Sequence, residues 1–265
     1  YYLTANIVVA SGTGVSIQAA NVTLDLRGFA IICSATSGPT GAAGIDVTAT
    51  ATGTVIRDGH IASGTFRAGG AVPFTFSARG FSSGVRVPSQ QGAAPLVENL
   101  SVTGCAGAGI DLSGRGAVMA CLAEGNAGNG ISASRVEMSI AFANGQFGIF
   151  ATDVVESSFA RENGTTGIAS VVVGNCQAMA NGGDGFSAST IAGSSALFNT
   201  GSGISTNGGI VQACAVHGNS SFGIQAYRGT VTGSVASQNG DDGIQSTKGS
   251  ISSSFGYANA GEGLE

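Results

Sequence analysis

One short phrase recurs eight times between Val118 and Leu264 and constrains the fold more than any other feature of the chain. Each copy consists of Asn, three variable residues, Gly and a large apolar residue, and the copies follow one another at intervals of 18 to 20 residues. A rigid phrase with a slightly variable period indicates a solenoid, in which one corner is fixed and the others absorb changes of length. The copies are Asn126–Gly130–Ile131, Asn144–Gly148–Ile149, Asn163–Gly167–Ile168, Asn181–Gly185–Phe186, Asn199–Gly203–Ile204, Asn219–Gly223–Ile224, Asn239–Gly243–Ile244 and Asn259–Gly263–Leu264.

The other fixed positions of the repeat favour short strands. Eight residues before each Asn lies Val or Ile, five before it lies Ser or Cys, and three before it usually Ala. β-Branched and small residues at such positions suit strands stacked in register, which predicts one turn of a parallel β-helix per repeat. The Asn fits a left-handed or turn position whose amide bonds the next Asn along the axis. The Gly fits either a positive φ or a close approach of two backbones.

This repeat carries a family resemblance. The phrase Val-x-x-[Ser/Cys]-x-Ala-x-x-Asn-x-x-x-Gly-Ile resembles the right-handed parallel β-helix repeat of the pectate-lyase-like superfamily, and the segment from Asn21 to Phe29 resembles the first coils of its uncharacterised bacterial members. The resemblance covers nearly the whole chain and implies one all-β domain over residues 1–265, with about twelve coils. Because the superfamily includes polysaccharide lyases, glycoside hydrolases, epimerases, phage tailspikes and adhesins, the resemblance does not choose a function.

Composition narrows the classes of partner. The chain has 45 Gly and 9% charged residues, which would suggest disorder without the repeat, but 43% apolar residues with a strict period indicate a narrow core. A net charge of −5 and the lack of a Lys/Arg run argue against nucleic acid. No apolar run approaches the length of a membrane span. The chain begins inside a strand-like run, which favours a processed or trimmed N-terminus. We expect a secreted or cell-surface protein whose signal peptide is not part of this sequence.

The five cysteines lack the spacing of metal ligands. Cys121, Cys176 and Cys214 occupy the Ser position of the repeat, so we predict small buried residues that form no disulfides. Cys105 takes the Asn position of the first regular coil. We expect no cofactor and no dedicated metal site, since carboxylates do not cluster as a Ca²⁺ cage requires, although Ca²⁺ shared with an acidic sugar stays open.

Two long loops distinguish the irregular coils of residues 1–96 from the regular coils of residues 97–265. Loops 34–43 and 65–83 leave the same corner of neighbouring coils, and loops on a rigid solenoid commonly carry function. Four of the ten basic residues lie between positions 57 and 86, which suits an anionic ligand such as a uronic acid chain; the alternative is that they only solvate the loop. The candidate substrate-binding residues are Arg57, Arg67, Phe74, Phe76, Arg79 and Phe81.

The candidate catalytic residues follow the corner apolar residue of consecutive coils. Asp46, Arg86 and Asp111 share this outward column, which places the two carboxylates roughly 10 Å apart across two strand spacings. That separation is near the upper limit for an inverting pair of carboxylates. The resemblance implies another role, in which Arg86 is the base of a β-elimination. The alternative to both is a charge ladder that satisfies itself. His60, in a coil next to the loops, is a further acid/base candidate.

Two further columns are too apolar for a solvated surface. The residues four and two positions before each Asn should point outward, and many are large and apolar, which predicts self-association or a covering segment unless the facing is reversed. The column four positions before Asn is Leu122, Ile140, Phe159, Gln177, Ser195, Ala215, Val235 and Phe255, and the column two positions before it is Glu124, Phe142, Arg161, Met179, Leu197, His217, Ser237 and Tyr257.

Two functions remain open from the sequence. The first is a module that binds carbohydrate or serves as a structural or adhesive scaffold, and the alternative is a lyase, hydrolase or epimerase acting on a uronic-acid polysaccharide.

Overall fold

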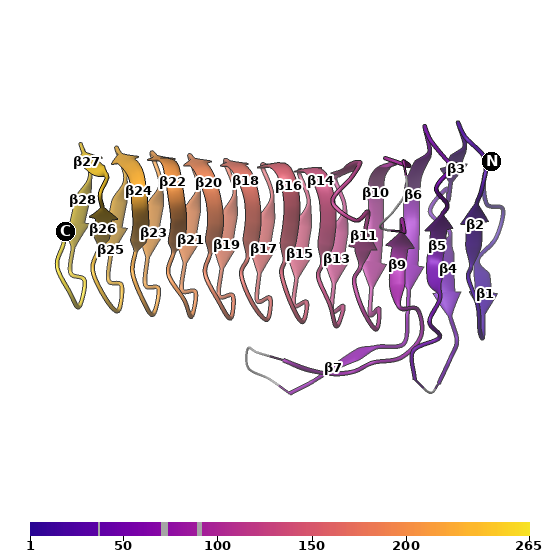
Figure 1. The fold of residues 1–265 in the computed structure, drawn as a ribbon. Coiled ribbons are helices and arrows are strands. Elements are labelled where there is room, and N and C mark those ends of the chain that lie inside the picture. The colour runs from indigo at the N-terminus through magenta and orange to yellow at the C-terminus, as the bar shows by residue number, and fades with distance from the viewer. Residues whose placement is uncertain (37, 70–73, 89–91) are drawn as a thin grey trace.

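The computed structural model describes residues 1–36, 38–69, 74–88 and 92–265. Apart from one antiparallel hairpin, the strands among these residues form a single parallel stack with about 12 turns, and the described residues include no helix, so the predicted all-β parallel β-helix is confirmed (Figure 1). The two termini lie at opposite ends of the stack (Figure 1). Residue 37 and residues 70–73, which fall in the two predicted loops, lie outside the described residues.

Each coil has three faces, which we call A, B and C in chain order. Face A begins at the Gly–apolar corner, face B contains the β-branched residue, and face C lies between the Ser/Cys position and the Asn. In most regular coils one long strand runs through faces A and B, and register shifts such as that between Ala133 and Arg135 mark the bend. The long strands are β14 (Ile131–Glu137), β16 (Ile149–Glu156), β18 (Ile168–Gly174), β20 (Phe186–Ala192), β22 (Ile204–Gln212) and β24 (Ile224–Thr232).

The remaining strands each belong to one face or join faces B and C. Face A has β2 (Val15–Ile17), β5 (Ala43–Val47), β9 (Ser83–Arg86), β11 (Ile110–Asp111) and β26 (Ile244–Thr247), and face B has β3 (Thr23–Asp25), β12 (Ala117–Met119) and β27 (Ser250–Ser252). β6 (Val55–Ala62) and β10 (Leu96–Thr103) run through faces B and C. Face C has β1 (Ile7–Val9), β4 (Ala30–Cys33), β13 (Leu122–Glu124), β15 (Ile140–Phe142), β17 (Phe159–Arg161), β19 (Gln177–Met179), β21 (Ser195–Leu197), β23 (Ala215–His217), β25 (Val235–Ser237) and β28 (Phe255–Tyr257).

The recurring Gly is required by a close approach of neighbouring coils. A Cβ atom on Gly148 would lie 2.6 Å from the carbonyl oxygen of Gly167 and 2.5 Å from Nδ2 of Asn163. The left-handed residue of the corner is the one before each Asn, such as Ala143 with φ 55° and Glu162 with φ 54°. The Asn itself occupies the turn, so of its two predicted conformations the left-handed one is wrong.

The predicted Asn ladder is confirmed. Nδ2 of Asn144 donates to Oδ1 of Asn163 at 3.0 Å, and Nδ2 of Asn163 donates to Oδ1 of Asn181 at 3.0 Å. The same Oδ1 atom of Asn163 also accepts the backbone N–H of Asn144 at 3.1 Å. These amides are fully buried and out of reach of water, so their polar atoms depend on these hydrogen bonds to be satisfied. The bonds continue in the same way from Asn126 to Asn259.

A second ladder runs along the Ser/Cys column. The N–H of Ser158 donates to Sγ of Cys176 at 3.4 Å, and the N–H of Cys176 donates to Oγ of Ser194 at 3.1 Å. Ser and Cys are therefore interchangeable parts of one column, as the sequence predicts. All five cysteines are free and buried. Burial raises the pKa of the Cys121 thiol to about 12 and that of the Cys176 thiol to about 11, so both thiols are protonated at neutral pH.

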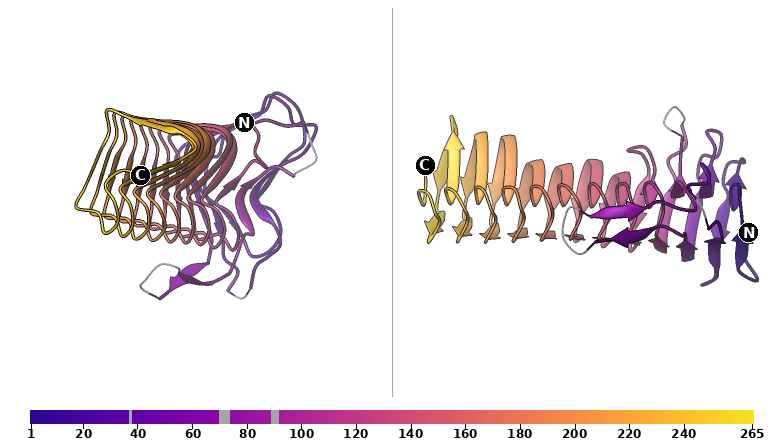
Figure 2. Two further views of the ribbon diagram at one scale, coloured as in Figure 1. Left: turned by 60° about the vertical axis from the view of Figure 1, so that its left-hand side comes forward. Right: turned by 90° about the horizontal axis from the view of Figure 1, so that it is seen from below.

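Both long loops leave the corner between faces C and A, as predicted. They pair with each other, because Pro39 bridges to Gly80 and the N–H of Thr40 donates to the carbonyl of Gly80 at 2.7 Å. The longer loop contains an antiparallel hairpin, β7 (Phe66–Ala68) and β8 (Thr75–Ser77), which forms a separate sheet. The hairpin projects from this corner and runs toward the C-terminal coils (Figures 1 and 2).

Candidate functional site

The three face A candidates lie in one column, as predicted. Asp46 pairs in register with Arg86, and Arg86 with Asp111, on consecutive rungs. Nε of Arg86 donates to Oδ1 of Asp46 at 2.8 Å. Oδ1 of Asp111 instead accepts the N–H of Ser113 at 2.9 Å, within its own turn. Two of the three groups are thus engaged with each other, and the third caps a turn.

The structure separates His60 from this column. His60 lies on face C, where it pairs in register with Ala30 and Ser101, and its side chain is exposed. It lines a shallow groove at the corner between faces B and C. The four catalytic candidates therefore divide into a column of three on face A and a single residue on face C, and they do not converge on one centre.

Phe81 is not a surface residue. Its side chain is fully buried, and its carbonyl accepts the N–H of Ala106 at 2.8 Å. The equivalent bond one coil later joins the N–H of Ala127 to the carbonyl of Cys105. Phe81 therefore stands in the column that holds Cys105 and then the Asn ladder. The prediction that Phe81 binds substrate is wrong, because its position in a long loop concealed its place in the core.

The other aromatic candidates attach the hairpin to the coils. Phe74 is 9% exposed and packs edge-on against Phe76, with ring centroids 6.4 Å apart. The ring of Phe76 lies 3.0 Å from where a Cβ atom on Gly145 would be, so it contacts the corner of a distant coil. Arg67 stacks over Phe74 at 4.1 Å and approaches Glu162 at 3.7 Å.

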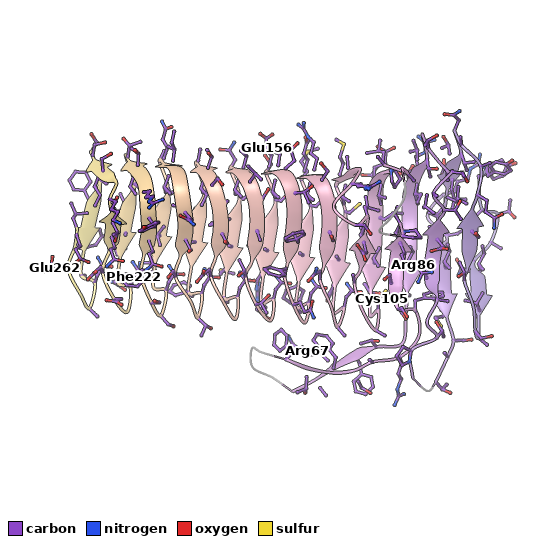
Figure 3. The ribbon with its side chains drawn as sticks, in the orientation of Figure 1. Arg67, Arg86, Cys105, Glu156, Phe222 and Glu262 are labelled. Atoms are coloured by element: carbon purple, nitrogen blue, oxygen red, sulfur yellow. The ribbon has the colours of Figure 1, made fainter. Side chains whose placement is uncertain are left out.

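The two remaining arginines lie elsewhere. Arg57 is on face B, where NH2 contacts Asp25 at 3.2 Å and Nε lies 3.5 Å from Asp58. Arg79 lies over the ring of Phe66 at 5.4 Å. Arg67 is therefore the arginine of the hairpin that faces the body of the solenoid. Figure 3 shows it beneath the coils, well separated from Arg86 on β9.

The hairpin and face C enclose a groove, which we call the hairpin groove. It has a volume of about 270 Å³. Glu124 and Thr103 contribute side chains that sequence reasoning missed, and the Glu124 carboxylate has no partner among the residues that the structure describes. Their membership depends on where a loop folds back, which the repeat pattern does not encode. The lining residues are Ser63, Thr65, Arg67, Thr103, Gly104, Glu124 and Gly125.

Face C carries the apolar outer columns, and the predicted facing is correct. Ala141 and Ala178 are fully buried, while the alternating residues point outward. Large exposed fractions occur at Ile140 with 43%, Phe255 with 67% and Tyr257 with 59%. The outer surface of this face is therefore unusually apolar along much of its length.

Within residues 1–36, 38–69, 74–88 and 92–265, no group of three or more His, Cys, Asp or Glu side chains is placed to hold a metal ion. The same residues include no helix capable of crossing a membrane. Burial raises the pKa of Asp184, whose Oδ1 accepts the N–H of Ser202 at 2.8 Å in the turn after the Asn ladder.

Neither a protein-family model nor a curated protein matches this sequence. Solved structures do match. The A-module of the mannuronan C-5 epimerase AlgE4 from Azotobacter vinelandii has a TM-score of 0.61 and 14% identity, over 98% of this chain and 87% of that one. The Dettilon tailspike protein gp208 has a TM-score of 0.56 and 12% identity, over 98% of this chain and 60% of that one. The A-module of AlgE6 from the same bacterium has a TM-score of 0.52 and 17% identity, over 91% and 68%.

At these identities the likeness shows the fold alone. That fold is the right-handed parallel β-helix that the resemblance to the pectate-lyase-like superfamily implies, and the expectation is confirmed.

Proposed function

We propose that this chain is an extracellular or cell-surface β-helix module that binds an acidic polysaccharide without cleaving it. The proposed binding site is the hairpin groove. The observation that carries the proposal is the position of Arg67, a guanidinium held in place at the edge of a groove whose other wall is polar.

Arg67 is well arranged to bind a carboxylate. Its side chain is 34% exposed, and stacking on Phe74 together with the contact to Glu162 fixes its direction. A guanidinium offers five N–H donors in a rigid fork, and one 3.7 Å contact to Glu162 leaves most of them unused. A pre-oriented fork loses little side-chain entropy when it binds, so a sugar carboxylate would gain a charge-assisted, bidentate contact.

The opposite wall suits the hydroxyl groups of the same sugar. Glu124 presents a carboxylate that has no partner in the described part of the chain and can accept hydrogen bonds, and Thr103 presents a hydroxyl that both donates and accepts. The residues that line the groove come from three successive coils, at Ser63–Thr65, Thr103–Gly104 and Glu124–Gly125. A solenoid with a fixed rise per coil suits an extended polymer better than a small molecule.

The face A column supports a role in binding over one in catalysis. Arg86 is paired with Asp46, and Asp111 accepts a hydrogen bond in its own turn, so these groups already have partners, as the charge-ladder alternative expects. The fold is also shared with a mannuronan epimerase module and a tailspike protein, which makes a carbohydrate partner at the cell surface a natural expectation. The apolar part of face C on the C-terminal coils, which carries Val235, Phe255 and Tyr257 beyond both grooves, associates by the same proposal with a second copy of the chain.

An enzyme that acts on a uronic-acid polysaccharide is the second candidate. The observation that favours it is the shared column, in which Asp46, Arg86 and Asp111 follow one another on adjacent rungs of face A. Incubation with polyuronates, followed by ultraviolet absorbance for unsaturated ends, reducing-sugar release and NMR for epimerised units, tests this candidate. Activity that disappears in a folded Arg86→Ala variant would replace the binding proposal with the enzyme.

Titration calorimetry tests the binding proposal. The intact protein is titrated with oligogalacturonate, oligomannuronate and, as a neutral reference, cello-oligosaccharide of the same length. We expect binding of a uronate that weakens with salt, and a loss of about tenfold to a hundredfold in Arg67→Ala, because one bidentate charged contact is removed. Arg79→Ala is the matched control, since Arg79 belongs to the same hairpin but stacks on Phe66 outside the groove. Equal losses in both variants, or no binding of either uronate, would refute the proposal.

A further inference from the structure

A second groove lies at the corner between faces B and C, on another side of the solenoid from face A. We call it the corner groove. It is open, with a volume of about 560 Å³, and spans the coils from Gly28 to Ile140. Its side chains come from two columns, the left-handed corner residues and the outward residues of face C.

The sequence makes this groove by a change of side-chain size along the corner column. Asp58, Asn99, Ala120 and Met138 occupy equivalent corner positions on consecutive coils, with φ of 60°, 52°, 51° and 48°. Ala120 is small between two longer neighbours, so the column dips there. On face C the small Ser101 lies beside the dip and Leu122 follows it on the next rung.

One end of the corner groove is polar and hydrogen-bonding. Nδ2 of Asn99 donates to Oδ1 of Asp58 at 3.1 Å, so a carboxylate and an amide are held side by side. His60 is exposed beside them, and Ser101 adds a hydroxyl. Adjacent planar acceptors and donors of this kind can bond two neighbouring hydroxyl groups at once.

The other end of the corner groove is an apolar platform. Met138 is 55% exposed and Ile140 is 43% exposed, and Leu122 lies between them and the polar end. An uncovered platform of this kind binds the C–H face of a ligand by removing apolar surface from water. The groove thus matches a compact molecule that has one apolar face and hydroxyl groups at its edge.

Electrostatics restricts the charge of that molecule. The Asp58 carboxylate is balanced by Arg57, which lies 3.5 Å from it on the face B side and also contacts Asp25. No Lys or Arg lines the corner groove among the residues described, so an anionic ligand would find no compensating cation there. The hairpin groove differs in that its lining includes a cation, Arg67, beside the Glu124 carboxylate.

From this arrangement we infer that the corner groove is a binding site for a neutral hexose. The C–H face of the pyranose ring lies on Leu122, one rung from Asn99, and vicinal hydroxyl groups bond to Asp58 and Asn99, with His60 and Ser101 at the edge. Met138 and Ile140, on the next rung, extend the apolar platform beyond the ring. The site is separate from the hairpin groove and goes beyond the binding of acidic polysaccharide. With both sites, one rigid module engages two kinds of sugar on two sides of its axis.

Filling the dip tests this inference with a well-matched control. Ala120→Met places a long side chain in the groove, and Met138 in the next coil shows that this column accepts Met at a positive φ. Ala213→Met makes the same change at the same corner position, with an identical φ of 51°, in a regular coil outside the groove. The two variants therefore share the backbone strain and differ in whether the groove is blocked.

The ligands tested are the methyl glycosides of glucose, galactose and mannose. The methyl glycoside of galacturonic acid, whose carboxylate is free, is the anionic reference. Saturation-transfer NMR identifies which of them bind, and chemical-shift titration gives the affinity. We expect at least one neutral glycoside to bind, with a loss of about tenfold or more in Ala120→Met and no change in Ala213→Met. Asp58→Ala should lose a similar factor, because it removes a charged hydrogen-bond acceptor.

Several outcomes would overturn the inference. They are the absence of saturation transfer from all three neutral glycosides, binding that Ala120→Met leaves intact, and, in the Arg67→Ala variant, tighter binding of the uronate than of any neutral sugar. The Arg67→Ala variant separates this site from the hairpin groove, because it should keep full affinity for the neutral glycoside. Failure of one site therefore leaves the other testable.

Discussion

The irregular N-terminal coils and the regular C-terminal coils solve the same packing problem with different residues. From Asn126 onward, the corner between faces C and A is filled by a buried amide that is bonded to both neighbouring coils. Before that point the same column holds Phe81 and then Cys105, which cannot form an amide ladder. Both long loops leave this corner ahead of the first ladder Asn.

This difference shows where the fold can accept an insertion. A ladder Asn requires its Gly four residues later to contact the next coil closely, so the corner length is fixed. An apolar side chain in the column requires only volume, so the chain before it can vary in length. The hairpin and both grooves lie mainly on coils at or before the start of the ladder, and the regular coils supply a rigid base.

The largest effect should come from removing the apolar side chain that replaces the amide. We expect Phe81→Ala to lower the free energy of unfolding by about 4 kcal/mol, since it removes a fully buried ring and leaves a cavity. Phe66→Ala, in the hairpin at 51% exposure, should change it by less than about 1 kcal/mol. Chemical denaturation followed by circular dichroism measures both. Similar losses in the two variants would place Phe81 outside the core column.

A smaller but still large loss should follow from interrupting the ladder. In Asn163→Ala the buried N–H groups of Asn144 lose their acceptor and the carbonyl of Ala141 loses a donor, which should cost about 3 kcal/mol. Asn175→Ala is the control, because Asn175 lies exposed at the corner between faces B and C, and it should cost less than about 1 kcal/mol. If the ladder variant were as stable as the control, the amide bonds would contribute nothing beyond filling space.

The regular coils could be predicted from sequence because every coil makes the same set of contacts with the next coil and therefore repeats the same residue types. The β-branched column, the Ser/Cys column and the Asn–Gly phrase each report a single contact with the next coil, so the pattern predicted their burial and pairing. The exact conformation of the Asn could not be predicted, because the left-handed turn falls on residues of many types, among them Ala143, Glu162 and Phe198.

The candidate sites were harder to predict because they depend on contacts outside the repeat. The Asp46–Arg86–Asp111 register followed from counting residues, but the choice of partner for Arg86 depends on side-chain geometry. Glu124 joins the hairpin groove only because the hairpin folds back over its coil. Phe81 was misplaced for the same reason, since a residue at the end of a long insertion shows no period.

The smallest effect at neutral pH should come from exchanging the two members of the second ladder. Cys176→Ser replaces a thiol by the hydroxyl that Ser158 and Ser194 already place in this column, so the free energy of unfolding should change by less than about 1 kcal/mol. At alkaline pH the difference in stability between the wild type and Cys176→Ser should change. Burial raises the pKa of the Cys176 thiol from 9.0 to about 11, so the unfolded chain releases this proton at a lower pH than the folded chain does. The wild type therefore loses stability as the pH rises from about 9 toward 11, and the serine variant, which has no proton to release there, loses less. Denaturation at about pH 8 and about pH 10.5 measures the shift, and a difference between the two proteins that does not vary with pH would mean that the folded thiol ionises as readily as the unfolded one.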